Sequence, residues 1–274
     1  MFALHDDVLI EVLQMAIDNL TDWSVLQTVC HWFRACVQNA RTLMNLDLKI
    51  THVAHLRQKC GMVKHLSPFN PNQTSIKLLA YMPRLQFLEV RGVSAEIEGD
   101  RLISDLACLK CLRLVQFWSS SIHTLLQRAT FEELEELYLY NCKQFGTPTM
   151  KLINRFPQLR TLELHHLKFD SSALLSLGVL SDLRHFTLVN NATVKNLDFV
   201  KPWRHLETLR LNGCRGLLNI NAIQNLVELH TLDLDHCFNV ENIDSNVACQ
   251  IATLKNFSAR NVPCVMHKIG IVYF

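Results

Sequence analysis

Leucines recur along most of the chain in the pattern L-x-x-L-x-L, in which one residue separates the last two leucines. The stretch 134–142 reads L-E-E-L-Y-L-Y-N-C, so Leu137 and Leu139 alternate with two tyrosines. Alternation with a period of two predicts a β-strand with one apolar face. A strand this short cannot bury that face alone. Its stability must therefore depend on copies of the same pattern that pack beside it.

The pattern recurs ten times, at intervals of 20 to 25 residues. The central leucine position of each copy is occupied by Leu46, Leu66, Leu88, Leu112, Leu137, Leu162, Phe186, Leu209, Leu232 and Phe257. A strand signature at this period is typical of the leucine-rich repeat. We therefore predict an α/β leucine-rich-repeat solenoid over residues 42–274, with a curved parallel sheet and with helices or turns on its convex side.

The segments between the predicted strands have the character of short helices or turns. The clearest are Ile122–Ala129, Thr149–Phe156, Ser171–Leu180 and Ser245–Ile251. Two repeats are irregular. Pro68 and Pro71 interrupt the repeat around Leu66, where a ladder needs N–H donors. In the last repeat Phe257, Ala259 and Val262 replace leucines, as expected of a unit that caps a stack.

Residues 1–41 differ from the repeats in both pattern and charge. Apolar residues recur three and four positions apart, which predicts three short helices. This segment carries two basic and five acidic residues, a net charge of −3, whereas the rest of the chain carries +5. We therefore predict a separate small domain over residues 1–41.

The first 33 residues resemble an F-box. The resemblance rests on Leu4-x-Asp6-Asp7-Val8-Leu9-x-x-Val12-Leu13 followed by Leu26-x-x-Val29-Cys30-x-x-Phe33. Three features depart from the family pattern: His5 stands where proline is usual, Phe33 stands where tryptophan is usual, and the segment between Leu13 and Trp23 is longer than usual. The alternative is a helical cap on the repeats.

The combination of the two segments strengthens this resemblance. The order of an F-box followed by leucine-rich repeats is similar to that of the F-box/leucine-rich-repeat (FBXL-type) family. Cys142, Cys214 and Cys237 also stand where the cysteine-containing repeats of that family have their cysteine. The resemblance implies a substrate-recognition subunit of a Skp–cullin–F-box ubiquitin ligase. Its partners would be a Skp-type adaptor, through it cullin and RING subunits, and a protein target.

The resemblance also implies which residues bind the adaptor. These are among Leu4, Val8, Leu9, Val12, Leu13, Leu26, Val29, Cys30 and Phe33. The sequence leaves open which of them face the adaptor and which face the core of the small domain. A function of a different class also stays open, namely a ligase-independent scaffold or inhibitor whose N-terminal helices only cap the solenoid.

The positions between the strand leucines point outward on the concave face of a leucine-rich-repeat sheet. Most are polar, as a solvated sheet requires, but exposed aromatic and apolar residues occur on consecutive central repeats. Aromatic residues flanked by charges are typical of protein-binding surfaces. The target-binding residues predicted on this basis are Val115, Tyr138, Tyr140, His165, Val189, Arg91 and Arg113. The alternative is that these side chains only pack against one another along the sheet.

The sequence gives little indication of catalysis. Cys108-x-x-Cys111 has the spacing of a metal or redox pair, but no second pair at ligand spacing accompanies it. Asp235-His236-Cys237 contains catalytic residue types, but the repeat register buries Cys237, whereas a reactive thiolate needs an exposed electropositive site. No Gly-rich phosphate loop, G-x-S-x-G or H-E-x-x-H occurs. We expect a non-enzyme without a cofactor or a metal.

Composition and charge narrow the remaining function classes. Hydrophobic residues make up 49% of the chain, which argues against a disordered protein. The net charge of +2 does not favour nucleic acid or an anionic membrane as a partner. We expect neither a membrane span nor a signal peptide. These features predict a cytoplasmic or nuclear location, where cysteines are thiols.

Overall fold

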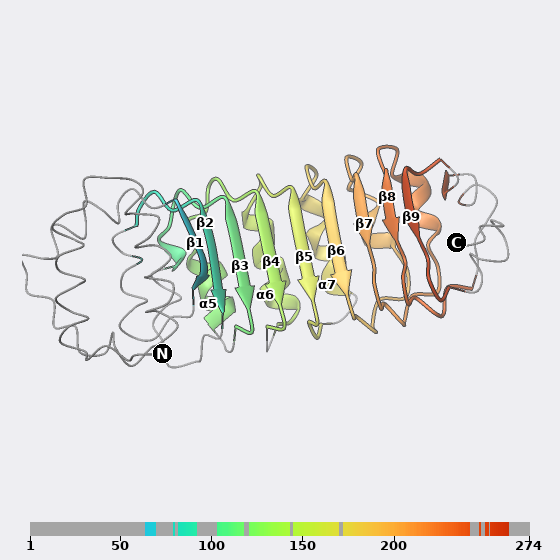
Figure 1. Cartoon of the computed structure of the whole chain (residues 1–274), viewed down its shortest axis with the longest axis horizontal. Coiled ribbons are helices and arrows are strands. Elements are labelled where there is room, and N and C mark those ends of the chain that lie inside the picture. The colour runs from blue at the N-terminus through green and yellow to red at the C-terminus, as the bar shows by residue number, and fades with distance from the viewer. Residues whose placement is uncertain are drawn as a thin grey trace, which may run out of the picture.

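The computed structural model describes residues 64–69, 79, 82–91, 103–117, 121–142, 145–169, 172–241, 247, 250, 251 and 253–262. Within these residues, nine strands form one sheet in which every neighbouring pair is parallel and the strand order follows the sequence. The strands lie side by side along the molecule (Figure 1). The predicted F-box, residues 1–41, and the first predicted repeat leucine, Leu46, lie outside the described residues.

The strands are short, and the helices between them are short as well. The strands are β1 (His65–Phe69), β2 (Phe87–Arg91), β3 (Cys111–Val115), β4 (Glu136–Tyr140), β5 (Thr161–His165), β6 (His185–Val189), β7 (Thr208–Arg210), β8 (Thr231–Asp233) and β9 (Asn256–Ser258). The α-helices are α5 (Ser121–Arg128), α6 (Thr147–Leu152) and α7 (Ser172–Leu175). The 3₁₀ helices are η3 (Ile153–Arg155), η4 (Ser176–Val179), η5 (Asp198–Val200) and η6 (Asn221–Asn225).

The register of the sheet is the one that the leucine pattern predicts. From Leu66 to Phe257, the predicted central positions pair with one another in a single row across all nine strands. The predicted irregularity around Leu66 is also confirmed, because the register between β1 and β2 shifts between Leu66 and Phe69. The sequence alone therefore defined which residues share each face of the sheet.

Backbone hydrogen bonds extend the ladder beyond both ends of the strands. Before the strand, one carbonyl of each repeat accepts from two consecutive N–H groups of the next repeat; for example, Lys110 O accepts from the N–H groups of Glu135 and Glu136 at 2.8 and 2.9 Å. After the strand, Asn141 N donates to His165 O at 2.8 Å, and the corresponding bond recurs along the sheet. Each repeat is thus fastened to the next at both edges.

The residue four positions after the central leucine position adopts a left-handed backbone conformation in the seven successive repeats of β3 to β9. These residues are Gln116, Asn141, His166, Asn190, Gly213, His236 and Asn261. Positive φ is uncommon for residues other than glycine, and asparagine tolerates it best. At Gly213 a side chain would also collide with Asn190 Oδ1 of the preceding repeat. The chain therefore turns out of the sheet at the same point in each repeat from β3 to β9.

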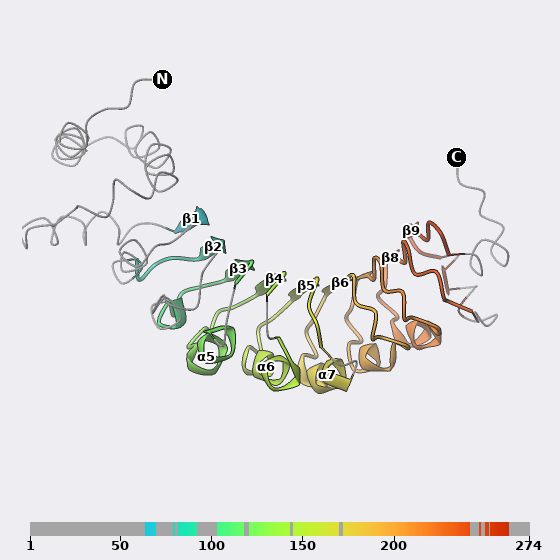
Figure 2. The ribbon, with the colours of Figure 1, turned by 90° about the horizontal axis from the view of Figure 1, so that it is seen from below.

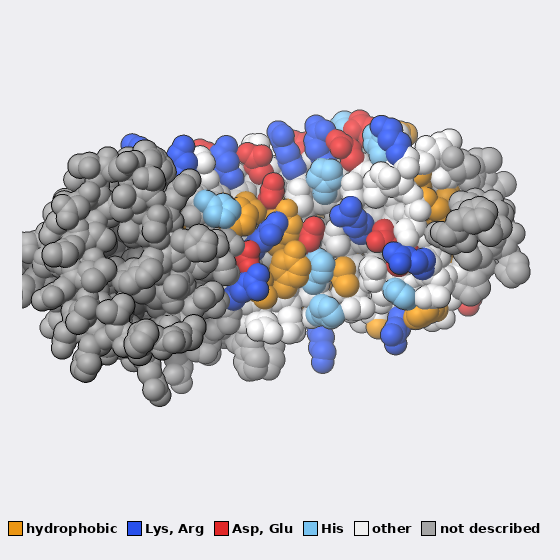
Figure 3. Space-filling model, viewed as in Figure 1, with side chains coloured by type: hydrophobic (Ala, Val, Ile, Leu, Met, Phe, Trp, Pro, Cys, Tyr) orange, Lys and Arg blue, Asp and Glu red, His pale blue; other side chains and the backbone are white. Residues whose placement is uncertain are grey.

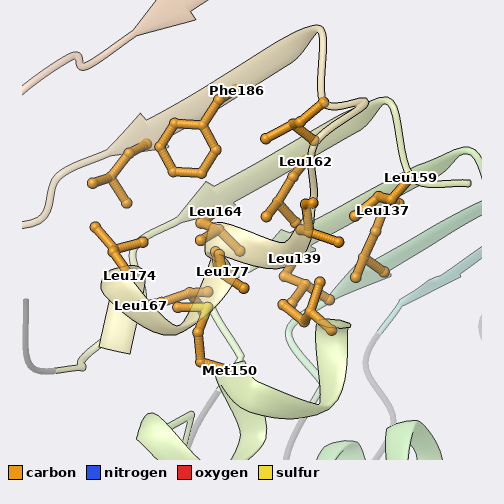
Figure 4. Packing of buried hydrophobic residues seen from close by; sticks show 14 of the residues in the cluster. Leu137, Leu139, Met150, Leu159, Leu162, Leu164, Leu167, Leu174, Leu177 and Phe186 are labelled. Carbon is orange, nitrogen blue, oxygen red and sulfur yellow. The ribbon is translucent and has the colours of Figure 1, made fainter. Parts of the chain in front are cut away.

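The strands line the concave side of an arc, and the helices line its convex side (Figure 2). Between these two layers lies one continuous core, formed by the repeat leucines and by side chains from the helices. Around β4 to β6, the strand residues Leu137, Leu162 and Phe186 belong to the same core cluster as Leu174 and Leu177 on the helical side (Figure 4). Because each repeat packs its leucines against its neighbours on this face, the core extends along the solenoid and has no single centre.

The predicted cysteine position, which follows the left-handed residue, is buried in the turn. The thiols of Cys142, Cys214 and Cys237 donate to the carbonyls of Leu114, Leu188 and Leu211, each in the preceding repeat, at 3.6, 3.5 and 2.7 Å. In the repeat of β6 the same position holds the buried Asn191. Its Oδ1 accepts from three donors of Thr193 and Val194. Both residue types thus supply hydrogen bonds that the tight turn needs.

The helices change along the arc. The predicted helices near 122–129, 149–156 and 171–180 correspond to α5, to α6 with η3, and to α7 with η4. Of the fourth predicted helix, 245–251, the described residues Val247, Gln250 and Ile251 are helical. Between α7 and these residues in the chain lie the short 3₁₀ helices η5 and η6. Trp203 fills the space beside them: it is fully buried, its ring centroid lies 5.0 Å from that of Phe186, and its indole N–H donates to Leu177 O at 3.2 Å.

Replacing Leu162 with alanine is expected to lower the free energy of unfolding by roughly 2–5 kcal/mol, because the surrounding repeats cannot collapse into the cavity. Leu162 is fully buried and lies between Leu137 and Phe186 in the central row. Urea denaturation followed by circular dichroism measures the change. Val227→Ala is the control: Val227 is 81% exposed, so the change should stay within about 0.5 kcal/mol. A near-neutral Leu162→Ala would contradict this packing.

Candidate functional site

Over β2 to β6, the concave face presents three columns of side chains, with one residue per strand in each column. Apolar side chains gather over its middle, around β3 to β6, and Arg, Glu and His side chains lie among them (Figure 3). The sheet register places Arg113, Tyr138 and Glu163 next to one another in the middle column. Val115, Tyr140, His165 and Val189 adjoin in the same way in the next column. The predicted central residues therefore form one continuous patch.

Arg113 lies between aromatic rings of the two neighbouring strands. Its Cζ atom is 4.2 Å from the ring centroid of Tyr138 on β4 and 5.5 Å from that of Phe87 on β2. Both distances are in the range of cation–π contacts, and a planar guanidinium stacks well on such rings. Arg113 is itself partly buried. Its position is thus defined by contacts on both sides.

A second group of contacts joins β4 to β5. The hydroxyl of Tyr140 donates to Glu163 Oε2 at 2.9 Å, and Nε2 of His165 lies 3.0 Å from the same oxygen. An ionised carboxylate only accepts hydrogen bonds, so Nε2 is the donor. The rings of Tyr140 and His165 also lie against each other, with centroids 4.3 Å apart. One carboxylate therefore orients two aromatic side chains.

The two tyrosines connect these groups. Their rings are parallel within 3°, with centroids 6.4 Å apart. The hydroxyl of Tyr138 donates to Glu136 Oε2 at 2.9 Å. The contacts thus run without a break from Phe87 on β2 to His165 on β5, and we call the residues Phe87, Arg113, Glu136, Tyr138, Tyr140, Glu163 and His165 the central patch.

The electrostatics of the central patch favour one protonation pattern. Burial raises the pKa of Tyr138 to about 12, and its hydrogen bond to Glu136 acts in the same direction. Burial also raises the pKa of Tyr140, and the Glu163 carboxylate adds to this effect. For Glu163, burial would raise the pKa, but hydrogen bonds from His165 and Tyr140 outweigh burial and hold the pKa below its ordinary value. Both hydroxyls are donors, and Glu163 is their ionised neighbour.

The exposure of the central patch corrects one expectation. Tyr138, which we expected to be exposed, is buried, with 9% of its surface accessible. Arg113 lies over its ring and the ring of Tyr140 lies beside it, so lateral packing along the sheet covers it. Tyr140 and His165 remain partly accessible, as do the two valines of their column, Val115 and Val189. Lateral packing, the alternative stated above, is thus present.

Arg91 and Arg113, the two arginines of the predicted site, make different contacts. Arg91 is exposed and pairs with Glu89 on its own strand, with 2.5 Å between Nη2 and Oε1. Arg113 lies opposite Glu89 on the neighbouring strand. Among the described residues, however, no ion pair joins Arg113 to a carboxylate. The two arginines of the predicted site are therefore in different states.

Three residues of the central patch were not among the predicted site residues. Phe87, Glu136 and Glu163 contribute the second ring beside Arg113 and the two acceptors for the tyrosine hydroxyls. Glu163 lies between two strand leucines, a position that the alternation turns outward. Phe87 and Glu136 each stand one position before the central leucine, and the same alternation turns them outward as well. The sequence signal that could have identified the two glutamates is an acidic residue at an outward position beside a tyrosine on the same strand or the next one.

The other candidates from the sequence have structural explanations. Cys111 is buried on the concave side, and burial beside Glu136 raises its pKa to about 12, so the thiol stays protonated. Cys108 is partly exposed. Within the described residues, no group of three or more His, Cys, Asp or Glu side chains could hold a metal ion. None of the helices in this part of the chain is long and apolar enough to cross a membrane.

Asp235 belongs to a network that orders the last described repeat. Its carboxylate accepts from the hydroxyl of Ser258 at 2.6 Å and from the backbone N–H and Nε of Arg260 at 2.8 and 2.9 Å. Burial would raise the pKa of Asp235, but these donors outweigh burial and lower it. The adjacent Cys237 is fully buried. Asp235 thus fastens β9 to β8 and does not form a catalytic group with its sequence neighbours.

The described chain therefore has the leucine-rich-repeat fold, an α/β solenoid whose concave sheet typically serves protein interaction. No protein-family model matches the chain. Similarity to solved structures agrees with the fold. Internalin C2 from Listeria monocytogenes is similar at 19% identity with a TM-score of 0.53, over 74% of this chain and 83% of that chain.

Two further solved structures resemble the chain. The yeast Rad7 and Elc1 complex is similar at 17% identity with a TM-score of 0.50, over 80% of this chain and 68% of that chain. The leucine-rich-repeat domain of the type III effector XopL is 16% identical with a TM-score of 0.47, over 96% of this chain and 98% of that domain. At these identities the similarity concerns the fold alone.

Stability is expected to fall in acid as Glu163 becomes protonated. Because the pKa of Glu163 in the folded chain lies below its ordinary value of 4.5, its contribution to stability is fully present above that value and is lost as pH falls through the folded-state pKa. Urea denaturation of the wild type and of Glu163→Gln, from about pH 7 downward, measures the difference. The two curves should converge in acid.

Glu132→Gln is the matched control for this titration. Glu132 is exposed, and its replacement with glutamine removes the same charge as Glu163→Gln does. Its stability difference from the wild type should change little with pH. If Glu163→Gln and Glu132→Gln behave alike, Glu163 does not bind the donors described above.

Proposed function

We propose that this chain is the substrate-recognition subunit of a Skp–cullin–F-box ubiquitin ligase. Residues 1–41 would act as the F-box and bind a Skp-type adaptor, and through it the cullin and RING subunits. The repeats would hold the target protein on their concave face. The chain itself makes and breaks no bond; it raises the effective concentration of target lysines near the conjugating enzyme. A cytoplasmic or nuclear location belongs to this proposal.

The observation that carries the proposal is the central patch, which follows an F-box-like sequence in the same chain. The patch combines aromatic rings, a stacked arginine and a surrounding set of charged residues, the composition in which protein-binding energy concentrates. Its side chains are held by hydrogen bonds within the sheet, so little freedom is lost when a partner binds. A chain of this fold also assembles with a second protein in the yeast Rad7 and Elc1 complex.

The accessible members of the predicted site define where the target would lie. Tyr140, His165, Val115 and Val189 expose part of their surface on consecutive strands, and Arg113 adjoins them. Tyr138 is covered by Arg113 and lies beside Tyr140, so it would contribute to target binding by holding these two side chains in place. We therefore propose Tyr140 and His165 as the principal aromatic contacts of the target.

A ligase-independent scaffold or inhibitor is the alternative function. It needs the same concave face, but it assigns residues 1–41 to a cap that covers the first repeats. Three departures from the F-box pattern favour it, namely His5, Phe33 and the longer segment between Leu13 and Trp23. The two functions differ in one respect: only the ligase subunit binds a Skp-type adaptor.

The full chain is expected to co-purify with a Skp-type adaptor when the two are co-expressed. Replacing both Leu9 and Val12 with aspartate should abolish the association, because two charges would have to be buried in an apolar interface. Circular dichroism should show that the repeats stay folded in this variant. Tyr140→Ala is the control, and it should leave the adaptor bound.

The opposite outcome identifies the scaffold. If the wild-type chain binds no adaptor, and if limited proteolysis cuts the repeats faster after removal of residues 1–41, these residues are a cap. In that case the variant with aspartate in place of Leu9 and Val12 should lose stability, and neither it nor the wild type should bind an adaptor. The two proposals thus predict different results from the same pair of variants.

A further inference from the structure

The guanidinium of Arg113 is held in position, and it makes no ion pair with any residue that the structure describes. Rings on both neighbouring strands lie against it, at 4.2 Å from Tyr138 and 5.5 Å from Phe87. Its Nε atom is enclosed without a hydrogen-bond acceptor among the described residues. Arg91 pairs with Glu89, and Arg184 pairs with Glu207 at 2.6 Å. Arg210 on β7 also makes no ion pair with a described residue, but only Arg113 combines that lack with rings on both neighbouring strands.

The carboxylates around Arg113 are already bound to other donors. Glu89 pairs with Arg91, and Glu136 accepts from the hydroxyl of Tyr138. Glu163 accepts from Tyr140 and His165. A basic group of a partner would have to compete with these donors. An acidic group would instead meet a cation that is held in place and has no ion-pair partner within the described part of the chain.

We propose that Arg113 binds a single carboxylate side chain, from an aspartate or a glutamate, in a protein segment that lies across β3 to β6. Binding would form charge-assisted hydrogen bonds to the guanidinium, which the two rings hold in place in advance. The inference rests on the proposed target-binding role of the concave face. It does not depend on the F-box assignment of residues 1–41.

The charges of the patch favour one carboxylate over a polyanion. Arg113 has Glu89 directly opposite on β2, and Glu136 and Glu163 lie on the next two strands. A chain of phosphates laid along the face would approach all three carboxylates and be repelled. One carboxylate on an otherwise uncharged segment would bring a single negative charge to Arg113, so the repulsion by these carboxylates would be smaller. The partner is therefore a protein segment and not a nucleic acid.

The neighbouring column indicates what accompanies the acidic residue. Val115 lies on the same strand as Arg113, and Tyr140 and His165 follow beside Val115 in register. These side chains are partly accessible and offer apolar and aromatic surface. Burial of such surface stabilises contacts with aliphatic or aromatic side chains. The expected motif is an acidic residue close to an apolar one.

Selection of binders from a random 12-residue peptide library, with the purified full chain as bait, tests the proposal. We expect the selected peptides to be enriched in an acidic residue near an apolar residue. The Arg113→Gln variant should bind them about tenfold more weakly. Replacing the acidic residue of the peptide with its amide should weaken wild-type binding to a similar degree. In the Arg113→Gln variant, the same amide replacement in the peptide should weaken binding little further. Such non-additive effects would indicate that Arg113 and the acidic residue of the peptide interact directly.

Arg210→Gln is the matched control. Arg210 is exposed in the same column, four strands from Arg113, and the substitution removes an equal charge. Its affinity for the peptides should stay near that of the wild type. Thermal denaturation checks that both variants are folded, and Arg113→Lys provides a second test if Arg113→Gln is not. The lysine keeps the charge but loses the planar stack, so it should bind with intermediate affinity.

The contrary results are equally specific. Selected peptides without acidic enrichment, additive effects of the two replacements, or tighter binding of a 12-nucleotide single strand would each overturn the proposal. If peptides depend on Tyr140 but not on Arg113, the target-binding face stands and this inference fails. If no peptide is selected, both this inference and the target-binding proposal fail, whereas adaptor binding remains a separate measurement.

Discussion

The structure depends on one constraint, namely that a repeat can bury its leucines only against its two neighbours. A five-residue strand and a short helix do not enclose a core of their own. The row from Leu66 to Phe257 meets this constraint because equivalent residues lie opposite one another at every step. Carbonyls at one edge of the sheet and left-handed residues at the other hold that register. A slip of one residue would turn every buried leucine toward solvent.

This constraint also explains how much of the fold could be predicted from the sequence. The spacing of leucines fixes the strands, the row and the outward columns, because all three follow from alternation within a repeat and from the period between repeats. The exact ends of the helices do not follow, since the convex side accepts either α or 3₁₀ turns of similar length. The left-handed residues also escape prediction, because Gln116, His166 and His236 carry no glycine signal.

The candidate site was predicted in position but not in its internal contacts. Alternation identifies Arg113, Tyr138 and Glu163 as outward residues, whereas their exposure depends on side chains that lie some 25 residues away in the sequence. Tyr138 is buried because Arg113, one repeat earlier, lies across its ring. A pattern within one repeat contains no information about such a contact. Only the register, once known, shows which outward residues are neighbours.

The alternation of side chains along each strand makes the core largely independent of the residues on the concave surface, although this independence is incomplete. Leucines point to the convex side and outward residues to the concave side, so most changes in the columns leave the core untouched. The central patch departs from this independence. Because Tyr138 is buried under Arg113, and because Glu163 orients both Tyr140 and His165, a change at one member alters the positions of the others. Recognition on this face would therefore be a property of the set, in which packing between side chains holds each binding group in place before a partner arrives.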